Sequence, residues 1–82
     1  MKVTKETIKD LTLMLLYLTS WEEKQLGMKN NRSWKSYDFE ILDELADEEL
    51  IYGSHKAKSV YIEETGIQKA KTLLKEYGLE ID

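Results

Sequence analysis

The sequence contains no cysteine and no proline, and it has only one histidine, His55. Without cysteine there can be no disulfide bond, no thiol nucleophile and no cysteine-bound zinc. One histidine also excludes a metal site built from several imidazoles. The longest apolar run, residues 11–18, is much shorter than the roughly 18 residues that a membrane-spanning helix needs. We therefore expect no metal, no cofactor and no membrane segment.

The size and the N-terminal residues point to a small domain of the cytoplasm. With 82 residues, of which 41% are apolar and 34% are charged, the chain is expected to form a single globular domain over residues 1–82. A secretory signal would be basic where Glu6 and Asp10 stand, and small residues would follow the apolar run where Trp21 stands. A cytoplasmic location is the expectation that remains.

Three helices are predicted from apolar spacing and capping residues. The first runs from about residue 4 to residue 21, with Thr4 as N-cap, and the second runs from about residue 39 to residue 49, with Asp38 as N-cap. The third starts near Thr65, which has capping-box spacing to Gln68, and ends before Gly78 in a Schellman motif. The expected buried stripe of the second helix is Phe39, Leu42, Leu45, Ala46 and Leu50.

The first helix carries more apolar residues than one buried face requires. We assign its core stripe to the residues at regular helical spacing, Ile8, Leu11, Leu15 and Leu18. The rest of its circumference is also apolar, and a helix that is apolar on all sides must be enclosed. We therefore expect a second copy of the chain to cover the remaining group, Leu13, Met14, Leu16 and Tyr17.

Short β-structure is predicted only after the second helix. Residues 51–52 and 59–62 resemble two strands, and residues 53–58 between them suit a hairpin loop. Residues 22–36 are mostly polar, and we interpret them as a frayed helical end followed by a loop that Trp34 anchors to the domain. The expected fold is α+β and mainly helical: helix, loop, helix, two-stranded hairpin and C-terminal helix.

Two resemblances accompany this element order. The run Ile41-Leu42-Asp43-Glu44-Leu45, the pair Leu50-Ile51, the segment Lys58-Ser59-Val60-Tyr61-Ile62 and Gly66 resemble the helix-plus-wing half of small winged-helix regulators such as the PadR and MarR families. This resemblance covers roughly residues 38–77 and implies a single winged-helix-like domain. The whole chain is also similar to a family of short uncharacterised bacterial proteins that share Leu-Tyr-Leu, Trp-Lys-Ser-Tyr-Asp-Phe and Lys-Ala-Lys-Ser-Val.

Charge is distributed unevenly along the chain, whose formal net charge is −4. Residues 38–49 contain no base and seven acids: Asp38, Glu40, Asp43, Glu44, Asp47, Glu48 and Glu49. In a DNA-binding winged helix this segment would enter the major groove, where phosphate repels carboxylates. We expect the acids to form a solvated outer face, which disfavours docking of this helix on DNA. The basic residues fall in the loop and the wing, where Arg32, Lys35, His55, Lys56 and Lys58 could form one patch for nucleic acid or for an acidic partner.

No arrangement of residues indicates catalysis. Ser54 and His55 are neighbours on a glycine-containing loop, with no acid evidently placed to orient the imidazole, and no phosphate-binding glycine motif occurs. We expect a non-enzymatic regulatory or adaptor module that acts through protein contacts and self-association. The alternative is a DNA-binding transcriptional regulator that uses the basic loop and wing.

Overall fold

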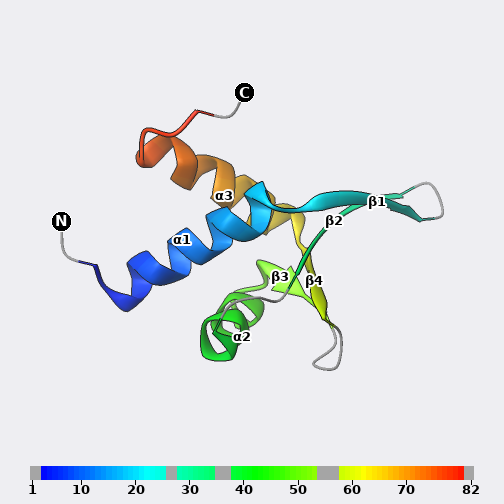
Figure 1. The fold of residues 1–82 in the computed structure, drawn as a ribbon, viewed down its shortest axis with the longest axis horizontal. Coiled ribbons are helices and arrows are strands. Elements are labelled where there is room, and N and C mark those ends of the chain that lie inside the picture. Colours follow the sequence, from blue (N-terminus) through cyan, green and yellow to red (C-terminus); the bar gives the residue numbers. More distant parts are fainter. Residues whose placement is uncertain (1–2, 26–27, 35–37, 54–57, 81–82) are drawn as a thin grey trace.

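The described part of the chain folds into three helices and a four-stranded antiparallel sheet (Figure 1). The computed structural model describes residues 3–25, 28–34, 38–53 and 58–80. The elements in chain order are α1 (Lys5–Leu18), β1 (Trp21–Gln25), β2 (Met28–Trp34), α2 (Phe39–Asp47), β3 (Ile51–Tyr52), β4 (Ser59–Ile62) and α3 (Glu64–Glu76). The fold is thus α+β and mostly helical, as predicted.

The first two helices begin at the predicted caps. The Thr4 hydroxyl accepts from the Thr7 backbone N–H at 3.2 Å, and the Thr7 hydroxyl accepts from the Thr4 N–H at 3.3 Å, which makes a reciprocal capping box. The Asp38 carboxylate accepts from the Glu40 N–H at 2.8 Å at the start of α2. These side chains satisfy donors that a helix start leaves without partners.

One end of α3 matches the prediction and the other does not. At its C-terminus Gly78 is left-handed (φ 73°), and the Leu79 N–H donates to the Leu74 carbonyl at 2.8 Å, as in a Schellman motif. At its N-terminus the predicted cap is wrong, because Thr65 already lies inside the helix. Its hydroxyl donates instead to the Glu49 carbonyl at 2.7 Å, a tertiary bond to the end of α2.

The prediction of a loop over residues 22–36 is wrong, because most of this segment is a β-hairpin. Strands β1 and β2 pair antiparallel from Trp21 with Arg32 to Gln25 with Met28. Strand β2 is also bonded through its side chains to the end of α1: the Ser33 and Thr19 hydroxyls lie 3.2 Å apart, and the Asn31 amide donates to Ser20 Oγ at 3.2 Å. The hairpin projects away from the helices (Figure 1).

Strands β3 and β4 form at the predicted residues, but they are not an isolated pair. The sheet order is β1-β2-β4-β3, so β4 is paired with β2 on one side and β3 on the other. Ile62, for example, stands opposite Ile51 in β3 and opposite Asn31 in β2. The two-stranded wing of the prediction is therefore part of a four-stranded sheet.

The core lies between the three helices and one face of the sheet. Phe39 and Ala46 do not belong to it, contrary to the prediction for α2, because both side chains face solvent and Ile41 takes a buried position instead. Thirteen apolar residues form this core: Leu13, Met14, Leu16, Ile41, Leu42, Leu45, Leu50, Ile51, Val60, Ile62, Ala70, Leu73 and Leu74.

A close backbone contact joins α3 to the segment between α2 and β3. A Cβ atom placed on Gly66 would lie 2.1 Å from the Leu50 carbonyl oxygen, so only glycine fits there without displacement of the backbone. The same carbonyl accepts from the Glu63 N–H at 2.9 Å. One residue earlier, Glu49 holds a left-handed conformation (φ 60°) that ends α2. This junction sets how α3 lies against the sheet.

Candidate interaction surfaces

The predicted cationic patch lies only partly within the described residues. Lys35, His55 and Lys56 lie outside them, while Lys58, the residue before β4, is exposed. Arg32, in β2, is only partly exposed. Its Nε donates to Ser59 Oγ at 2.9 Å, and its guanidinium carbon lies 4.7 Å from the centre of the Tyr61 ring. The two described members of the patch are thus an exposed lysine and an arginine fixed against an aromatic ring.

A row of large side chains crosses the outer face of the sheet. Trp21 stands opposite Arg32, Arg32 opposite Tyr61 and Tyr61 opposite Tyr52, so the row takes one residue from each strand. Directly opposite residues share a face, and their neighbours along β4 and β3 point into the core. The rings of Tyr52 and Tyr61 are stacked, with centroids 5.0 Å apart and planes 17° from parallel. The outer face of the sheet is therefore a rigid row of one cation and aromatic rings.

The environment of Tyr52 disfavours its ionised form. Partial burial raises the pKa of the Tyr52 hydroxyl, and the negative charge of Glu63 and the neighbouring Tyr61 raise it further. Tyr52 remains a neutral phenol, able to donate or accept a hydrogen bond, throughout the physiological range.

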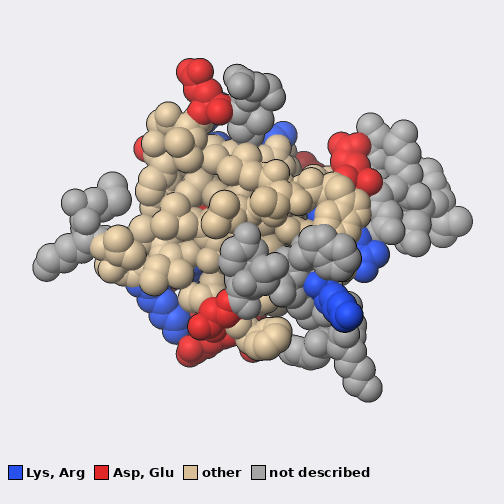
Figure 2. All heavy atoms as spheres, viewed as in Figure 1, with Lys and Arg blue, Asp and Glu red and all other residues tan. Residues whose placement is uncertain are grey.

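The acids of residues 38–49 are mostly exposed, as expected, but several of them are also paired with lysines of other helices. Lys5 Nζ lies 3.5 Å from Glu40 and 3.4 Å from Glu44, and Glu48 binds Lys9 at 2.6 Å and Lys69 at 3.8 Å. Figure 2 shows acidic and basic groups side by side along the lower edge, over α2 and the start of α1. The paired acids, Glu40, Glu44 and Glu48, recur every four residues and so form one side of α2.

These pairs also affect the lysines. Hydrogen bonds to Glu48 and then Glu6 raise the pKa of Lys9, although burial opposes this effect; its side chain is almost fully enclosed. A hydrogen bond to Glu44 and the charge of Glu40 raise the pKa of Lys5, which is exposed.

The other side of α2 remains acidic. Asp43 and Asp47 are exposed, and neither is in an ion pair formed within the described residues. Phe39 lies on the same side, one turn before Asp43, and this side contains no base. The lysines from α1 and α3 thus neutralise the inner acids only, and the outward face of α2 stays unsuited to a polyanion.

The two apolar groups of α1 are reversed relative to the prediction. Leu13, Met14 and Leu16 are buried in the core of the same chain, and Tyr17 packs against that core. These residues are therefore not available to a second copy. The group that was assigned to the core is exposed instead by 40 to 48%: Ile8, Leu11, Leu15 and Leu18. We call these four residues the α1 stripe.

The buried side of α1 could not be recognised from apolar spacing, because it includes two polar residues, Lys9 and Thr12. Both are buried, because Lys9 is bound by Glu6 and Glu48, and the Thr12 hydroxyl donates to the Ile8 carbonyl at 2.7 Å. Polar groups satisfied in this way are tolerated in a core. At about 100° per residue the α1 stripe and Thr7 share one side of the helix, while the charged residues Lys5, Glu6, Lys9 and Asp10 lie on its other sides.

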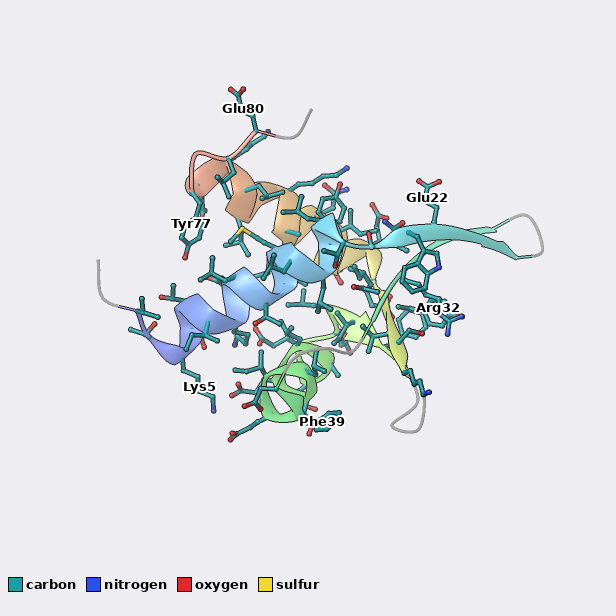
Figure 3. All side chains as sticks on the ribbon, viewed as in Figure 1. Lys5, Glu22, Arg32, Phe39, Tyr77 and Glu80 are labelled. Carbon is teal, nitrogen blue, oxygen red and sulfur yellow. The ribbon has the colours of Figure 1, made fainter. Side chains whose placement is uncertain are left out.

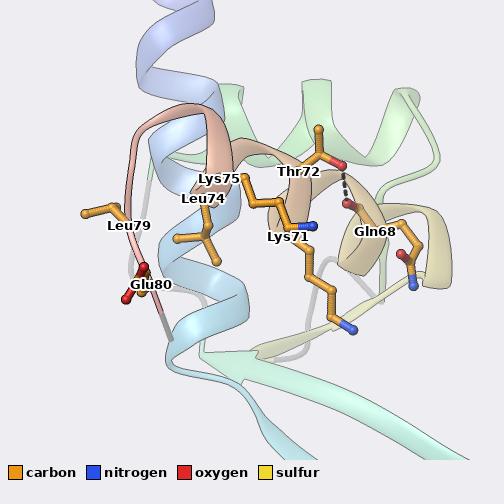
Figure 4. A pocket seen from close by; sticks show the side chains of 7 residues that line it. All are labelled: Gln68, Lys71, Thr72, Leu74, Lys75, Leu79 and Glu80. Carbon is orange, nitrogen blue, oxygen red and sulfur yellow. Dashed lines mark hydrogen bonds between the residues drawn. The ribbon is translucent and has the colours of Figure 1, made fainter. Parts of the chain in front are cut away.

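The described surface has hollows beside α3 and beside α2. The larger, of about 620 Å³, is open and lies along α3 and the segment after it, between Leu74, Leu79, Lys71 and Lys75 (Figure 4). The Thr72 hydroxyl donates to the Gln68 carbonyl at its edge. The smaller, of about 100 Å³, lies between α2 and strands β3 and β4.

Neither a metal site nor a membrane span emerges from the described residues. They contain no group of three or more metal-ligating side chains, and none of their helices combines the length and apolar character needed to cross a bilayer. Ser54 and His55, considered above for catalysis, lie outside the described residues.

Comparison with known proteins places the chain in a family. The model of a domain of unknown function, DUF6429, matches residues 4–80, which is nearly the whole chain. The chain belongs to this family. This agrees with the predicted similarity to short uncharacterised proteins. For this DUF6429 chain, no curated protein and no solved structure gave a significant match.

Proposed function

We propose that this DUF6429 chain is a non-enzymatic, cytoplasmic protein-contact module that forms a homodimer through the α1 stripe. The supporting observation is the exposure of Ile8, Leu11, Leu15 and Leu18 on a helix face that has no charge, in a chain of which 34% is charged. Figure 2 shows that uncharged residues cover most of the face over α1 and α3. A continuous apolar surface of this kind marks an interaction site.

The spacing of the stripe favours another helix as its partner. Its residues are three, four and three positions apart, which is the a/d seam of two helices that cross at about 20°. A second copy offers the same uncharged helix face, and a two-fold axis pairs the seam with itself. Half-burying a leucine gains about 1 kcal/mol, so the four stripe residues of each of two copies gain about 8 kcal/mol together, and association costs several kcal/mol. We therefore expect a weak dimer, with a Kd no tighter than the micromolar range.

Sedimentation velocity across a concentration series tests this proposal. The wild-type chain should shift from monomer to dimer between low and high micromolar concentrations. Leu11→Gln with Leu15→Gln should remain monomeric and folded, because glutamine suits an exposed helix position. The matched control carries two glutamines on α3, Lys71→Gln with Glu76→Gln, and should dimerise as the wild type does. A wild-type chain that is monomeric throughout the series contradicts the proposal.

DNA binding is the second candidate, and the row on the sheet favours it. Arg32 and Tyr61 form a fixed cation–aromatic pair on the outer face, and the exposed Lys58 stands three residues before Tyr61 in the sequence. In this proposal the chain is a regulator of winged-helix type, and the loop and wing, rather than the acidic α2, contact phosphates. Fluorescence anisotropy with a DNA duplex at 50 mM salt tests it. Binding should weaken steeply with salt and disappear in Lys56→Glu with Lys58→Glu.

We rank DNA binding second for an electrostatic reason. The outward side of α2 carries Asp43 and Asp47, which have no ion pair within the described residues, and the chain as a whole is negative. Both features oppose the counterion release that drives most protein–DNA affinity.

A further inference from the structure

The smaller hollow, between α2 and the edge of the sheet, has a chemically distinctive lining. Leu42, Ile51 and Val60 contribute its apolar surface, and Phe39, Tyr52 and Asp43 also line it. Asp43 is the only charged residue among the described residues that line this pocket. At about 100 Å³ the pocket suits a single side chain rather than a whole ligand. We call it the α2–β3 pocket.

The aromatic residues of the pocket are held in different ways. Tyr61 covers one face of the Tyr52 ring, and the Arg32 guanidinium lies over the Tyr61 ring, so Tyr52 is fixed at the end of the row on the sheet. Phe39 is 70% exposed and projects from the first turn of α2 on the side away from α1 (Figure 3). A phenylalanine so exposed forms no part of the core, and it leaves an aromatic surface available to a partner.

We propose that the α2–β3 pocket binds an arginine side chain from a basic segment of a partner protein. A guanidinium stacks on aromatic rings and donates two parallel hydrogen bonds to a carboxylate, so Phe39, Tyr52 and Asp43 together provide both kinds of contact. The surroundings have the complementary charge, because the outward side of α2 adds Asp47 and carries no lysine or arginine.

Other occupants fit the pocket less well. An apolar side chain would contact Leu42, Ile51 and Val60, but it would remove water from Asp43 without supplying a charge or a donor. A nucleic acid would bring phosphates toward Asp43 and Asp47, which repel them. The pocket therefore selects a cation that also has a flat, weakly hydrated surface, as the guanidinium does.

This inference extends the proposed function, since it depends on the chain acting through protein contacts and names a second kind of partner. The α2–β3 pocket shares no residue with the α1 stripe. The two proposals can therefore fail separately. The monomeric variant Leu11→Gln with Leu15→Gln should bind a basic peptide as the wild type does, and a dimer that binds no such peptide overturns only the pocket.

An NMR titration of the ¹⁵N-labelled full chain tests the pocket. The probe is the peptide acetyl-Gly-Ser-Arg-Gly-Arg-Ser-Gly-amide, and its control carries citrulline in place of both arginines, which keeps the shape and removes the charge. The arginine peptide should shift the amide signals of Phe39, Asp43 and Tyr52, with affinity at least fivefold above the citrulline peptide. Equal affinity for both peptides, or no shift at these amides, overturns the proposal.

Variants separate the pocket from general attraction to an acidic surface. Asp43→Asn should lower the affinity for the arginine peptide at least fivefold, and Phe39→Leu should also lower it. The control, Asp47→Asn, removes the same charge one turn away and outside the pocket, and it should change the affinity less than twofold. Equal losses in Asp43→Asn and Asp47→Asn overturn the proposal. The proposal is also overturned if a leucine-containing peptide or an oligothymidylate shifts the same amide signals as strongly as the arginine peptide does.

Discussion

Replacement of Gly66 by alanine offers a stringent test of how α3 is placed. Inside a helix this change alone would stabilise the chain by about 1 kcal/mol, since alanine has the highest helix propensity and glycine one of the lowest. Here the added methyl would lie 2.1 Å from the Leu50 carbonyl oxygen and 3.1 Å from Ile62 Cγ2, whereas ordinary contact begins at 3.4 Å. The new methyl group and the Leu50 carbonyl oxygen would have to move apart by about 1.3 Å. Because this oxygen belongs to closely packed backbone, it has little freedom to move.

The expected cost of Gly66→Ala is a net loss of about 2 to 3 kcal/mol. Overpacking of a core typically costs about 1 to 3 kcal/mol and occasionally more. The cost should lie at the upper end here, because movement of the Leu50 carbonyl also disturbs its hydrogen bond with the Glu63 N–H. At about 4 to 8 °C for each kcal/mol, the melting temperature should fall by roughly 8 to 24 °C. Urea unfolding followed by circular dichroism, together with thermal melts, measures both quantities.

A second glycine of the same helix region provides the control. Gly78 has a left-handed backbone (φ 73°) and open space around it, so Gly78→Ala should cost only the conformational penalty, about 1 kcal/mol. If Gly66→Ala proves as stable as the wild type, or less destabilised than Gly78→Ala, the close approach of α3 to Leu50 is refuted.

Two further predictions concern the junction after α2 and the buried lysine. Glu49→Gly should stabilise the chain by about 0.5 to 1 kcal/mol in urea unfolding, because Glu49 occupies a left-handed position (φ 60°) that glycine adopts without strain; an unchanged or lower stability would contradict this. Lys9→Met should cost about 1 to 2 kcal/mol, since it removes two charged hydrogen bonds from a buried site. Because folding raises the pKa of Lys9, the difference in unfolding free energy between wild type and Lys9→Met should be constant from pH 7 to about pH 10.5 and shrink above it; a difference that grows there would refute the assignment.

The helix starts could be predicted because their signals are local. Thr4 and Asp38 cap helices through bonds to residues two or three positions away, so the sequence itself contains both partners. The end of α3 at Gly78 depends equally on a few neighbouring residues. The true role of Thr65 could not be foreseen, because its hydroxyl donates to the carbonyl of Glu49, sixteen positions away.

The first hairpin and the exposed side of α1 required tertiary information. Glutamate, lysine and asparagine dominate β1 and β2, and these residues have low strand propensity, so only pairing of β2 with β4 explains the strands. On α1 the regular 3–4 spacing of the α1 stripe indicated a core, yet Lys9 and Thr12 point inward. Their burial depends on Glu48 of α2 and on a bond to the backbone, neither of which periodicity reveals.

The candidate surfaces were foreseen in part. Arg32 was expected in one patch with basic residues of the wing, and the sheet register places it directly opposite Tyr61 of β4. The exposure of Phe39 was missed, since its position in α2 matches the apolar stripe of that helix. Lysine pairing of Glu40, Glu44 and Glu48 was missed for a similar reason: Lys5, Lys9 and Lys69 come from other helices, and only the packed fold brings them to α2.

The absence of native cysteine permits a direct test of the central claim that the α1 stripe is an outward face covered by a second copy. A single thiol is introduced as Leu15→Cys, or as Thr72→Cys on the exposed side of α3, and its rate of alkylation is measured over a range of protein concentrations. The Leu15→Cys thiol should react quickly in dilute solution and more slowly as concentration rises, while Thr72→Cys reacts at a constant rate. A Leu15→Cys thiol that is protected at every concentration, or equally reactive at every concentration, would contradict the account.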